Sequence, residues 1–260
     1  MHISKSELKF LRSLSQKKVR QREGKFLIEG WKSLNDALNS DFHIDLVAMT
    51  QRYAEDSGYQ SFIRDINSRK VELKELTDRE LNQISDAVHA QGVVGLVRQR
   101  KASLDGIDLA NAALVVLADR IADPGNLGTV IRTCDWFAAD ALILSEGCVE
   151  LHNEKVVRST AGSIFHIPVI ENVETDTVLA RLKKQGFWIV ATAGDARESY
   201  TSAIYKERNV IIFSNEAHGV DQQTRRLADA VVTIPRRGKA ESLNVGVACG
   251  IILSHLRKEG

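Results

Sequence analysis

The amino-acid sequence predicts an α/β protein in two parts, a small N-terminal α/β domain and a larger C-terminal domain built on a parallel sheet. The chain of 260 residues is long enough for two ordinary domains, and its 43% of apolar residues can fill their cores. From residue 113 onward, short continuous apolar stretches alternate with stretches of helical periodicity. Apolar strands separated by helices are typical of a parallel sheet that helices cover on both faces.

The first hundred residues contain helical and strand-like stretches in mixed order. Leucines recur at helical spacing in Ser4–Leu14, and Thr77 with Glu80 forms a capping box that predicts a helix over Thr77–Ala87. The other expected elements are a helix at Trp31–Leu38 and strands at Phe26–Ile28, Ile44–Met49 and Val93–Val97. A polar stretch from 98 to 106 predicts the boundary, so we expect domains at 1–100 and 107–260.

The second part alternates strand and helix. Strands are expected at Ala113–Ala118, Ala141–Leu144, Phe187–Ala191, Val210–Phe213 and Ala230–Ile234. Helices are expected at Leu127–Phe137, Asp176–Lys184, Gln222–Leu227 and Leu243–Leu256. Ligands of such sheets bind beyond the carboxyl ends of the strands, so the loops that follow the strands are the places to search for a site.

Basic side chains are concentrated near the N-terminus. Residues 1–32 contain nine Lys or Arg and three Asp or Glu, although the whole chain has a net charge of only +1. This local excess suits a polyanion such as nucleic acid, with Lys17, Lys18, Arg20 and Arg22 as candidate phosphate contacts. The alternative is a solvated helix face that binds nothing.

The composition excludes a disordered chain, a disulfide-stapled miniprotein and a membrane protein. The longest apolar run, from 112 to 118, is far shorter than the ~20 residues that a bilayer core requires. The N-terminal residues are polar and charged, unlike a signal peptide. Three cysteines without a Cys-x-x-Cys pair favour a reducing environment, so we expect a cytoplasmic protein.

The loop after the strand at Ala113–Ala118 carries two candidate site residues. A Pro-Gly turn leads to Asn126, and Arg132 follows nearly two helical turns later. Both could point toward a ligand at the strand end. In the alternative interpretation, Asn126 only caps the helix and Arg132 only pairs with Asp119 or Asp135.

The loop after the strand at Val210–Phe213 carries Asn215, Glu216 and Gly219. A carboxylate at a strand end can accept hydrogen bonds from a hydroxyl or amine or pair with an arginine, and glycine permits a close backbone approach. Alternatively, Glu216 only stabilises the N-terminus of the next helix.

The loop after the strand at Ala230–Ile234 is basic. Arg236 and Arg237 could meet phosphate groups. Ser242 is a natural helix N-cap, and Asn244 is a poor helix former whose place in the expected first turn suggests another role.

Several other kinds of site have no sequence signature. The chain lacks a Gly-x-Gly-x-x-Gly loop after a strand, a Gly-Lys-Ser/Thr phosphate loop and a Gly-x-Ser-x-Gly turn. No cluster of His, Cys and carboxylates has the spacing of metal ligands, so no metal is expected.

Taken together, the three loops resemble those of the SpoU/TrmH family of RNA ribose 2′-O-methyltransferases, in the SPOUT superfamily. The motifs Asp-Pro-Gly-Asn-Leu-Gly-x-x-x-Arg, Asn-Glu-x-x-Gly and Ile-Pro-x-x-Gly-x-x-Glu-Ser-Leu-Asn-Val occur in the family's order, each after a strand. Residues 155–165 are similar to a further family stretch. Residues 22–32 resemble the family's small ribosomal-protein-like RNA-binding domain, so the resemblance covers nearly the whole chain.

The resemblance implies a C-terminal SPOUT domain with a trefoil knot, a homodimer, and S-adenosylmethionine as methyl donor. It implies that the cofactor is held largely by the backbone of the strand-end loops. The residues matching that role are Gly194, Ser214, Asn215, Gly219, Ile234, Ser242 and Leu243. The partner is RNA, and the N-terminal domain favours a structured RNA, ribosomal more than transfer RNA.

By the same resemblance, Arg132 acts on the ribose hydroxyl, while Asn126, Glu216, Ser242 and Asn244 orient it, the nucleotide and the loops. A guanidinium is almost always protonated. Two roles for Arg132 therefore remain open: a transiently deprotonated base helped by phosphate, or a cation that stabilises the developing alkoxide.

The sequence departs from the family pattern in the cofactor loop. Ser214 and Ala217 stand where glycine is usual, and Glu154 replaces a frequent proline. The Ser214 side chain could crowd the cofactor or point away from it. The main alternative is therefore an RNA-binding protein of this fold with weak or lost methyltransferase activity; an unrelated nucleotide-cofactor-binding protein is a third interpretation.

Overall fold

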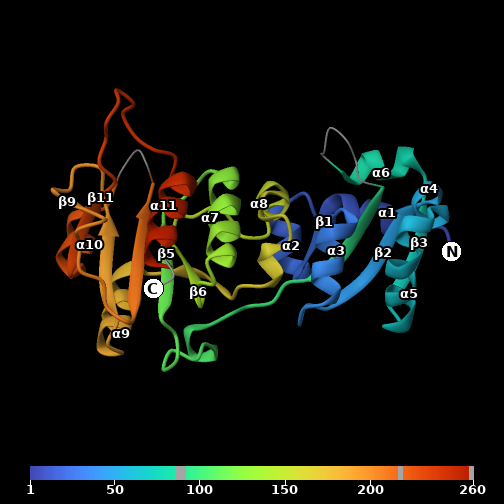
Figure 1. Ribbon diagram of the computed structural model, residues 1–260. Helices are drawn as coiled ribbons and strands as arrows, with labels where there is room; N and C mark the ends of the chain where they lie inside the picture. Colours follow the sequence, from blue (N-terminus) through green and yellow to red (C-terminus); the bar gives the residue numbers. More distant parts are fainter. Residues whose placement is uncertain (86–91, 216–218, 258–260) are drawn as a thin grey trace. The chain divides into compact units, whose positions relative to one another are not determined.

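In a computed structural model, the chain folds into two compact units (Figure 1). The structure describes residues 1–85, 92–215 and 219–257. One unit comprises Met1–Arg100 and His152–His166, and the other comprises Lys101–Leu151 and Ile167–Gly260. The segment His152–His166, which lies in the second half of the sequence, therefore packs with the first unit.

The N-terminal unit is a four-stranded mixed sheet with helices. Its strands are β1 (Lys25–Glu29), β2 (Ile44–Thr50), β3 (Glu72–Leu76) and β4 (Val93–Arg98), in the order β1-β4-β2-β3. Strand β4 is antiparallel to β1 and β2, while β2 and β3 are parallel. The helices are α1 (Lys5–Ser13), α2 (Lys17–Glu23), α3 (Trp31–Leu38), α4 (Gln51–Glu55), α5 (Gln60–Ser68), α6 (Asp78–Ile84) and α8 (Glu154–Thr160), with short 3₁₀ turns at Ser57–Tyr59 and Ser163–Phe165.

Local sequence explains where these helices begin and end. Thr77 and Glu80 form the expected capping box at the start of α6, and Ser4 with Glu7 forms a second one at α1. Helix α2 ends at Gly24, whose φ of 61° lies in the left-handed region that glycine adopts without strain. In the segment His152–His166, the ring of Phe165 lies against Phe26 and Phe42.

Arg20 corrects one expectation about RNA contacts. Its side chain is not on the basic surface, because the residue is only 2% exposed. Its Nη1 donates to the carbonyl oxygens of Leu14 at 2.8 Å and Ser15 at 2.7 Å, where α1 ends. Arg20 therefore joins α1 to α2. Lys17, Lys18 and Arg22 are exposed, as a phosphate contact requires.

The C-terminal unit is a parallel sheet of seven strands. They are β5 (Leu114–Asp119), β6 (Ala141–Ser145), β7 (Val169–Val173), β8 (Trp188–Thr192), β9 (Glu198–Ser199), β10 (Asn209–Ser214) and β11 (Ala230–Thr233). Their order is β7-β6-β5-β10-β8-β11-β9, and all paired neighbours run parallel. The five expected strands are present, whereas β7 and β9 were not predicted. A buried core lies around residues of β5, β8 and β10 such as Val115, Ile189 and Ile212.

The helices of this unit are α7 (Pro124–Trp136), α9 (Thr175–Lys184), α10 (Gln222–Leu227) and α11 (Val245–Leu256), with a 3₁₀ turn at Leu104–Gly106. Two expected helix starts were wrong. Asp123, not Asn126, caps α7, because its side chain accepts from the Asn126 N–H and Pro124 fits the first helical position. Asn244, not Ser242, caps α11 by accepting from the N–H groups of Gly246 and Val247. Among the helices that the structure describes, none is long and apolar enough to cross a membrane.

Candidate functional site

The candidate site lies at the carboxyl edge of the C-terminal sheet. Strands β5, β10, β8 and β11 are consecutive neighbours and parallel, so their carboxyl ends share one edge. The three loops singled out in the sequence follow β5, β10 and β11, and Gly194 follows β8. This edge is where ligands bind in parallel sheets.

A direct hydrogen bond joins the loop after β5 to the loop after β11. The Asn244 Nδ2 donates to the Asn126 Oδ1 at 2.7 Å. The Oδ1 of Asn244 meanwhile accepts from the Gly246 N–H at 2.9 Å, so this side chain both caps α11 and holds Asn126. Two residues 118 positions apart thus meet at the start of α7 and α11.

Arg132 projects from α7 as an exposed side chain. It makes no ion pair with Asp119 or Asp135, so the salt-bridge interpretation was wrong. Asp119 instead pairs with Arg120, with 2.8 Å between the Arg120 Nη2 and the Asp119 Oδ2. Within the part of the chain that the structure describes, the guanidinium of Arg132 has no hydrogen-bond partner, so its donors are not engaged by another described residue.

The loop after β10 is held at its start by Asn215. The backbone N–H of Asn215 donates to the Asp119 carbonyl at 3.1 Å, and its Nδ2 donates to the Arg120 carbonyl at 3.1 Å. Gly219, with φ of 60°, donates back to the Asn215 carbonyl at 2.8 Å. Glu216 lies outside the described residues, so the structure does not place this candidate.

The residues present fit a cofactor held by backbone groups. A Cβ added to Gly194 or Gly219 would meet no atom within 4 Å, so both glycines leave open space beside their backbone. The hydroxyl of Ser214 is buried and has no hydrogen-bond partner in the described parts of the chain. This oxygen is therefore shielded from solvent.

The loop after β11 is largely exposed. Ile234 is half-buried at the strand end, and Leu243 is 46% exposed. Arg236 closes part of the loop by donating from Nη1 to the Ala240 carbonyl at 3.3 Å, while Arg237 is exposed. Ser242 is exposed and makes no hydrogen bond with any residue whose position is described, Arg132 and Asn126 included.

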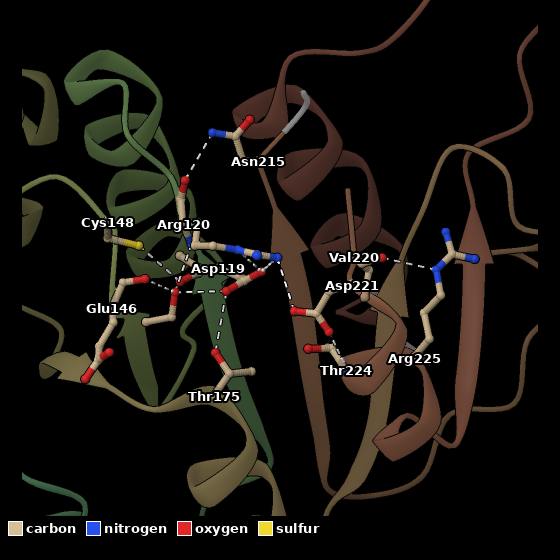
Figure 2. Close-up of polar contacts among 12 residues, drawn as sticks. Asp119, Arg120, Glu146, Cys148, Thr175, Asn215, Val220, Asp221, Thr224 and Arg225 are labelled. Atoms are coloured by element: carbon tan, nitrogen blue, oxygen red, sulfur yellow. Dashed lines mark hydrogen bonds and ion pairs between the residues drawn. The ribbon is translucent and has the colours of Figure 1, made fainter. Parts of the chain in front are cut away.

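Sequence reasoning missed a polar network that joins the ends of β5, β6 and β10 to the start of α10 (Figure 2). It contains Asp119, Arg120, Ser145, Asn215 and Asp221. Asp119 was considered only as a partner for Arg132. The sequence signal that could have revealed the network is the position of Asp119 and Arg120 at the carboxyl end of a buried strand.

Comparisons with known proteins show the family of the chain. The model of the SpoU rRNA Methylase family matches residues 113–254, and that of the MRM3-like substrate binding domain matches residues 5–95. A relative is the 23S rRNA (guanosine(2553)-2′-O)-methyltransferase RlmP of Bacillus subtilis, 32% identical over 252 residues that cover 96% of each chain. Another is the 23S rRNA (guanosine-2′-O-)-methyltransferase RlmB of Xanthomonas axonopodis pv. citri, 30% identical over 70% of this chain and 76% of that protein.

A solved structure is similar over the whole chain. The AdoMet-bound rRNA methyltransferase from Sinorhizobium meliloti has a TM-score of 0.87 and 29% identity, and the match covers 99% of this chain and 97% of that one. The family-model match spans the strands and loops that build the candidate site. The chain therefore belongs to the SpoU rRNA methylase family, within the SPOUT superfamily of RNA methyltransferases.

Proposed function

We propose that this protein transfers a methyl group from S-adenosylmethionine to a ribose 2′-hydroxyl of ribosomal RNA. The observation that carries the proposal is Arg132, exposed and without an ion pair among the described residues, on the same helix as Asn126, which Asn244 holds at the strand-end edge. The names of the relatives support ribosomal RNA as the substrate class. The AdoMet-bound structural neighbour supports the cofactor.

Arg132 stabilises the oxygen that loses its proton. When bound, S-adenosylmethionine supplies an activated methyl group on a sulfonium and leaves as S-adenosylhomocysteine, while the hydroxyl proton passes to solvent. The protein has to align the hydroxyl and stabilise its developing negative charge. An arginine stays protonated and presents a planar fork of donors, which suits an alkoxide better than it suits proton abstraction. We therefore assign Arg132 the electrostatic role, with Asn126 and Asn244 fixing the end of its helix.

Backbone groups of the strand-end loops hold the cofactor. Gly194, Asn215 and Gly219 lie after β8 and β10, and the open space beside both glycines admits a ligand. Ile234 and Leu243 contribute from the loop after β11. The alternative of a protein with weak or lost activity depended on crowding by Ser214, and the buried Ser214 hydroxyl gives that alternative no support.

RNA binding involves both units. Lys17, Lys18 and Arg22 are exposed in the unit that matches a substrate binding domain, and Arg236 and Arg237 are exposed beside the catalytic edge. We propose domains at 1–100 and 107–260, with 152–166 packing on the first. The trefoil knot, the homodimer and the cytoplasmic location remain predictions from the family resemblance and the composition.

Two measurements test the proposal. Calorimetry with S-adenosylmethionine reports cofactor binding, and mapping of ribose methylation across ribosomal RNA, with and without the gene, reports the reaction. We expect binding and the loss of one or a few methylated riboses. An unchanged methylation map, with no transfer to ribosomal RNA by the purified protein, would refute the proposed function.

A further inference from the structure

Arg120 has a backbone conformation that is unusual for its residue type. It directly follows β5, with φ of 53°. Side chains other than those of glycine, asparagine and aspartate rarely adopt this left-handed region, because Cβ approaches the backbone too closely. When such a residue persists at a strand end beside a candidate site, the surrounding structure must hold it in place.

The left-handed turn directs both backbone groups of Arg120 to neighbouring strands. Its N–H donates to the Oγ of Ser145, at the end of β6, at 2.9 Å. Its carbonyl oxygen accepts from the Nδ2 of Asn215, just after β10, at 3.1 Å. The backbone of Arg120 thus fixes Asn215, at the start of the connection between β10 and α10 (the β10–α10 loop).

The side chain of Arg120 reaches the other end of the same loop. Its Nη2 lies 2.8 Å from the Oδ2 of Asp119, which is 2% exposed, and 3.3 Å from the Oδ2 of Asp221. Asp221 caps α10, since its Oδ1 accepts from the Thr224 N–H at 2.7 Å. That hydrogen bond and, to a smaller extent, the charge of Arg120 lower the pKa of Asp221.

A second arginine continues this connection to the next strand. Arg225 of α10 pairs with Asp195, in the loop after β8, and its Nε donates to the Val220 carbonyl at 3.2 Å. Ion pairs and hydrogen bonds therefore connect the ends of β5 and β10 to α10 (Figure 2), and the Arg225–Asp195 pair continues the connection to the loop after β8.

We propose that Arg120 is a positioning residue that holds Asn215 and Asp221, the two ends of the β10–α10 loop, so that Asn215 and Gly219 can bind the cofactor. Arg120 touches neither the cofactor nor the ribose in this assignment; it acts through Asn215 and Asp221. The inference rests on the proposed function, because the loop contains Asn215 and Gly219, which we assign to S-adenosylmethionine binding.

Arg120→Gly isolates the contribution of the side chain. Glycine adopts a positive φ without strain, so the turn and its backbone hydrogen bonds can persist while the guanidinium is lost. We expect the dissociation constant for S-adenosylmethionine to rise roughly tenfold, the effect of losing a charge-assisted interaction. The melting temperature should stay within a few degrees of wild type, and the single-turnover rate at saturating cofactor should be nearly unchanged.

Two further variants sharpen the test. Asp221→Asn retains the capping oxygen of α10 but loses the charge that Arg120 meets, so it should weaken cofactor binding in the same direction. In the double variant, Arg120→Gly with Asp221→Asn, the loss of binding free energy should be smaller than the sum of the losses in the two single variants. Both substitutions break the same interaction, so their effects are coupled. Arg181→Ala is the matched control, because Arg181 is 42% exposed against 40% for Arg120 and also pairs with an aspartate, Asp105.

The outcomes separate this inference from the proposed function. If wild type does not bind S-adenosylmethionine, the proposed function fails. If wild type binds and Arg120→Gly binds equally well, only the positioning role is overturned. A fall in melting temperature that accounts for the affinity change would likewise show that Arg120 only stabilises the fold.

Discussion

Arg132 is exposed on α7 without an ion pair among the described residues, and this decides how its substitutions should behave. Truncating an arginine that pairs with another residue destabilises the fold, because the partner is left unpaired. Arg132 has no such partner, so its removal should leave the fold intact. Its effects should then be confined to the reaction.

We expect Arg132→Ala and Arg132→Lys to bind S-adenosylmethionine almost normally and to methylate RNA at least ~100-fold more slowly. Lysine keeps the charge but loses the planar fork, so it should not restore the rate. Single-turnover methylation, calorimetry and melting curves measure the three properties. A lysine variant with near-normal turnover would show that Arg132 has no specific catalytic role.

The sequence could predict that the residues around Arg132 share one edge, but not how Arg120 acts. Parallel strands bring their post-strand loops together, so a shared location for Asn126 and Asn244 follows from the strand pattern alone. The role of Arg120 depends on its φ and on partners 95 and 101 residues away. Neither quantity has a local sequence signal, and arginine would not be expected at a positive φ.

At the scale of elements, the sequence predicted the buried strands better than the exposed ones. Strand β10 is buried from Asn209 to Phe213 and reads as a continuous apolar run. Strand β7 carries Glu171 and Asn172 in its exposed part at the sheet edge, and β3, at another edge, has three charged residues among its five. Edge strands need only one apolar face, so their pattern is weak.

Helices α7 and α11 approach closely at Gly246. A Cβ added to Gly246 would lie 2.5 Å from the Cγ2 of Thr129, whereas one added to Gly250 would lie 4.0 Å from the Cγ2 of Thr133. Thr129 cannot rotate freely, because its Oγ1 donates to the Gly125 carbonyl at 2.8 Å. The same substitution should therefore have opposite effects at the two glycines.

We expect Gly246→Ala to lower the free energy of unfolding by about 1–3 kcal/mol, the usual cost of overpacking. It should also weaken catalysis, because the added carbon would lie 3.2 Å from the Oδ1 of Asn244. Gly250→Ala, on the same helix, should be neutral or stabilise by up to about 1 kcal/mol through helix propensity. Chemical denaturation of both variants checks this; equal effects would mean that helix packing does not limit position 246.

The segment His152–His166, which packs with the N-terminal unit, carries a buried histidine whose charge state affects the stability of the fold. His152 is 4% exposed beside the ring of Phe26, and burial, followed by the charge of Arg20, lowers its pKa from 6.5 to about 4. Below pH 6.5 the unfolded chain therefore binds a proton that the folded chain does not. Stability is lost as the pH falls from 6.5 toward 4 and is retained above that window.

We expect acidification from pH 7 to pH 5 to cost about 2 kcal/mol more in wild type than in His152→Phe. His166→Phe is the control, because His166 lies in the same segment but is exposed. Denaturation at both pH values, with hydrogen exchange to assign the change to the N-terminal unit, measures the difference. Equal pH dependence in wild type and His152→Phe would show that His152 does not control acid stability.

At the scale of the whole molecule, the near-neutral net charge conceals a separation of roles. Nine basic residues lie within positions 1–32, and the unit that contains them matches a substrate binding domain, while the candidate catalytic edge belongs to the other unit. Affinity for RNA and the chemical step should therefore respond to different substitutions. Arg20 is excluded from the RNA-binding set by its burial, which leaves Lys17, Lys18 and Arg22 as the residues to test in the N-terminal unit.

Replacing Lys17, Lys18 and Arg22 with alanine should weaken binding to ribosomal RNA and flatten its salt dependence. Each lost phosphate contact lowers the slope of log affinity against log salt by roughly 0.7–0.9, so three contacts should lower it by about 2–3.

The control replaces three exposed basic residues of the same unit, Arg64, Lys70 and Arg79, and so removes the same total charge. Binding titrations at several salt concentrations give both slopes. If the control flattens the slope equally, the effect comes from overall charge; if neither variant changes it, the basic N-terminal face is only solvated. A change confined to the first variant, with cofactor affinity unaltered, would place phosphate recognition on α2, because both variants carry the same net charge.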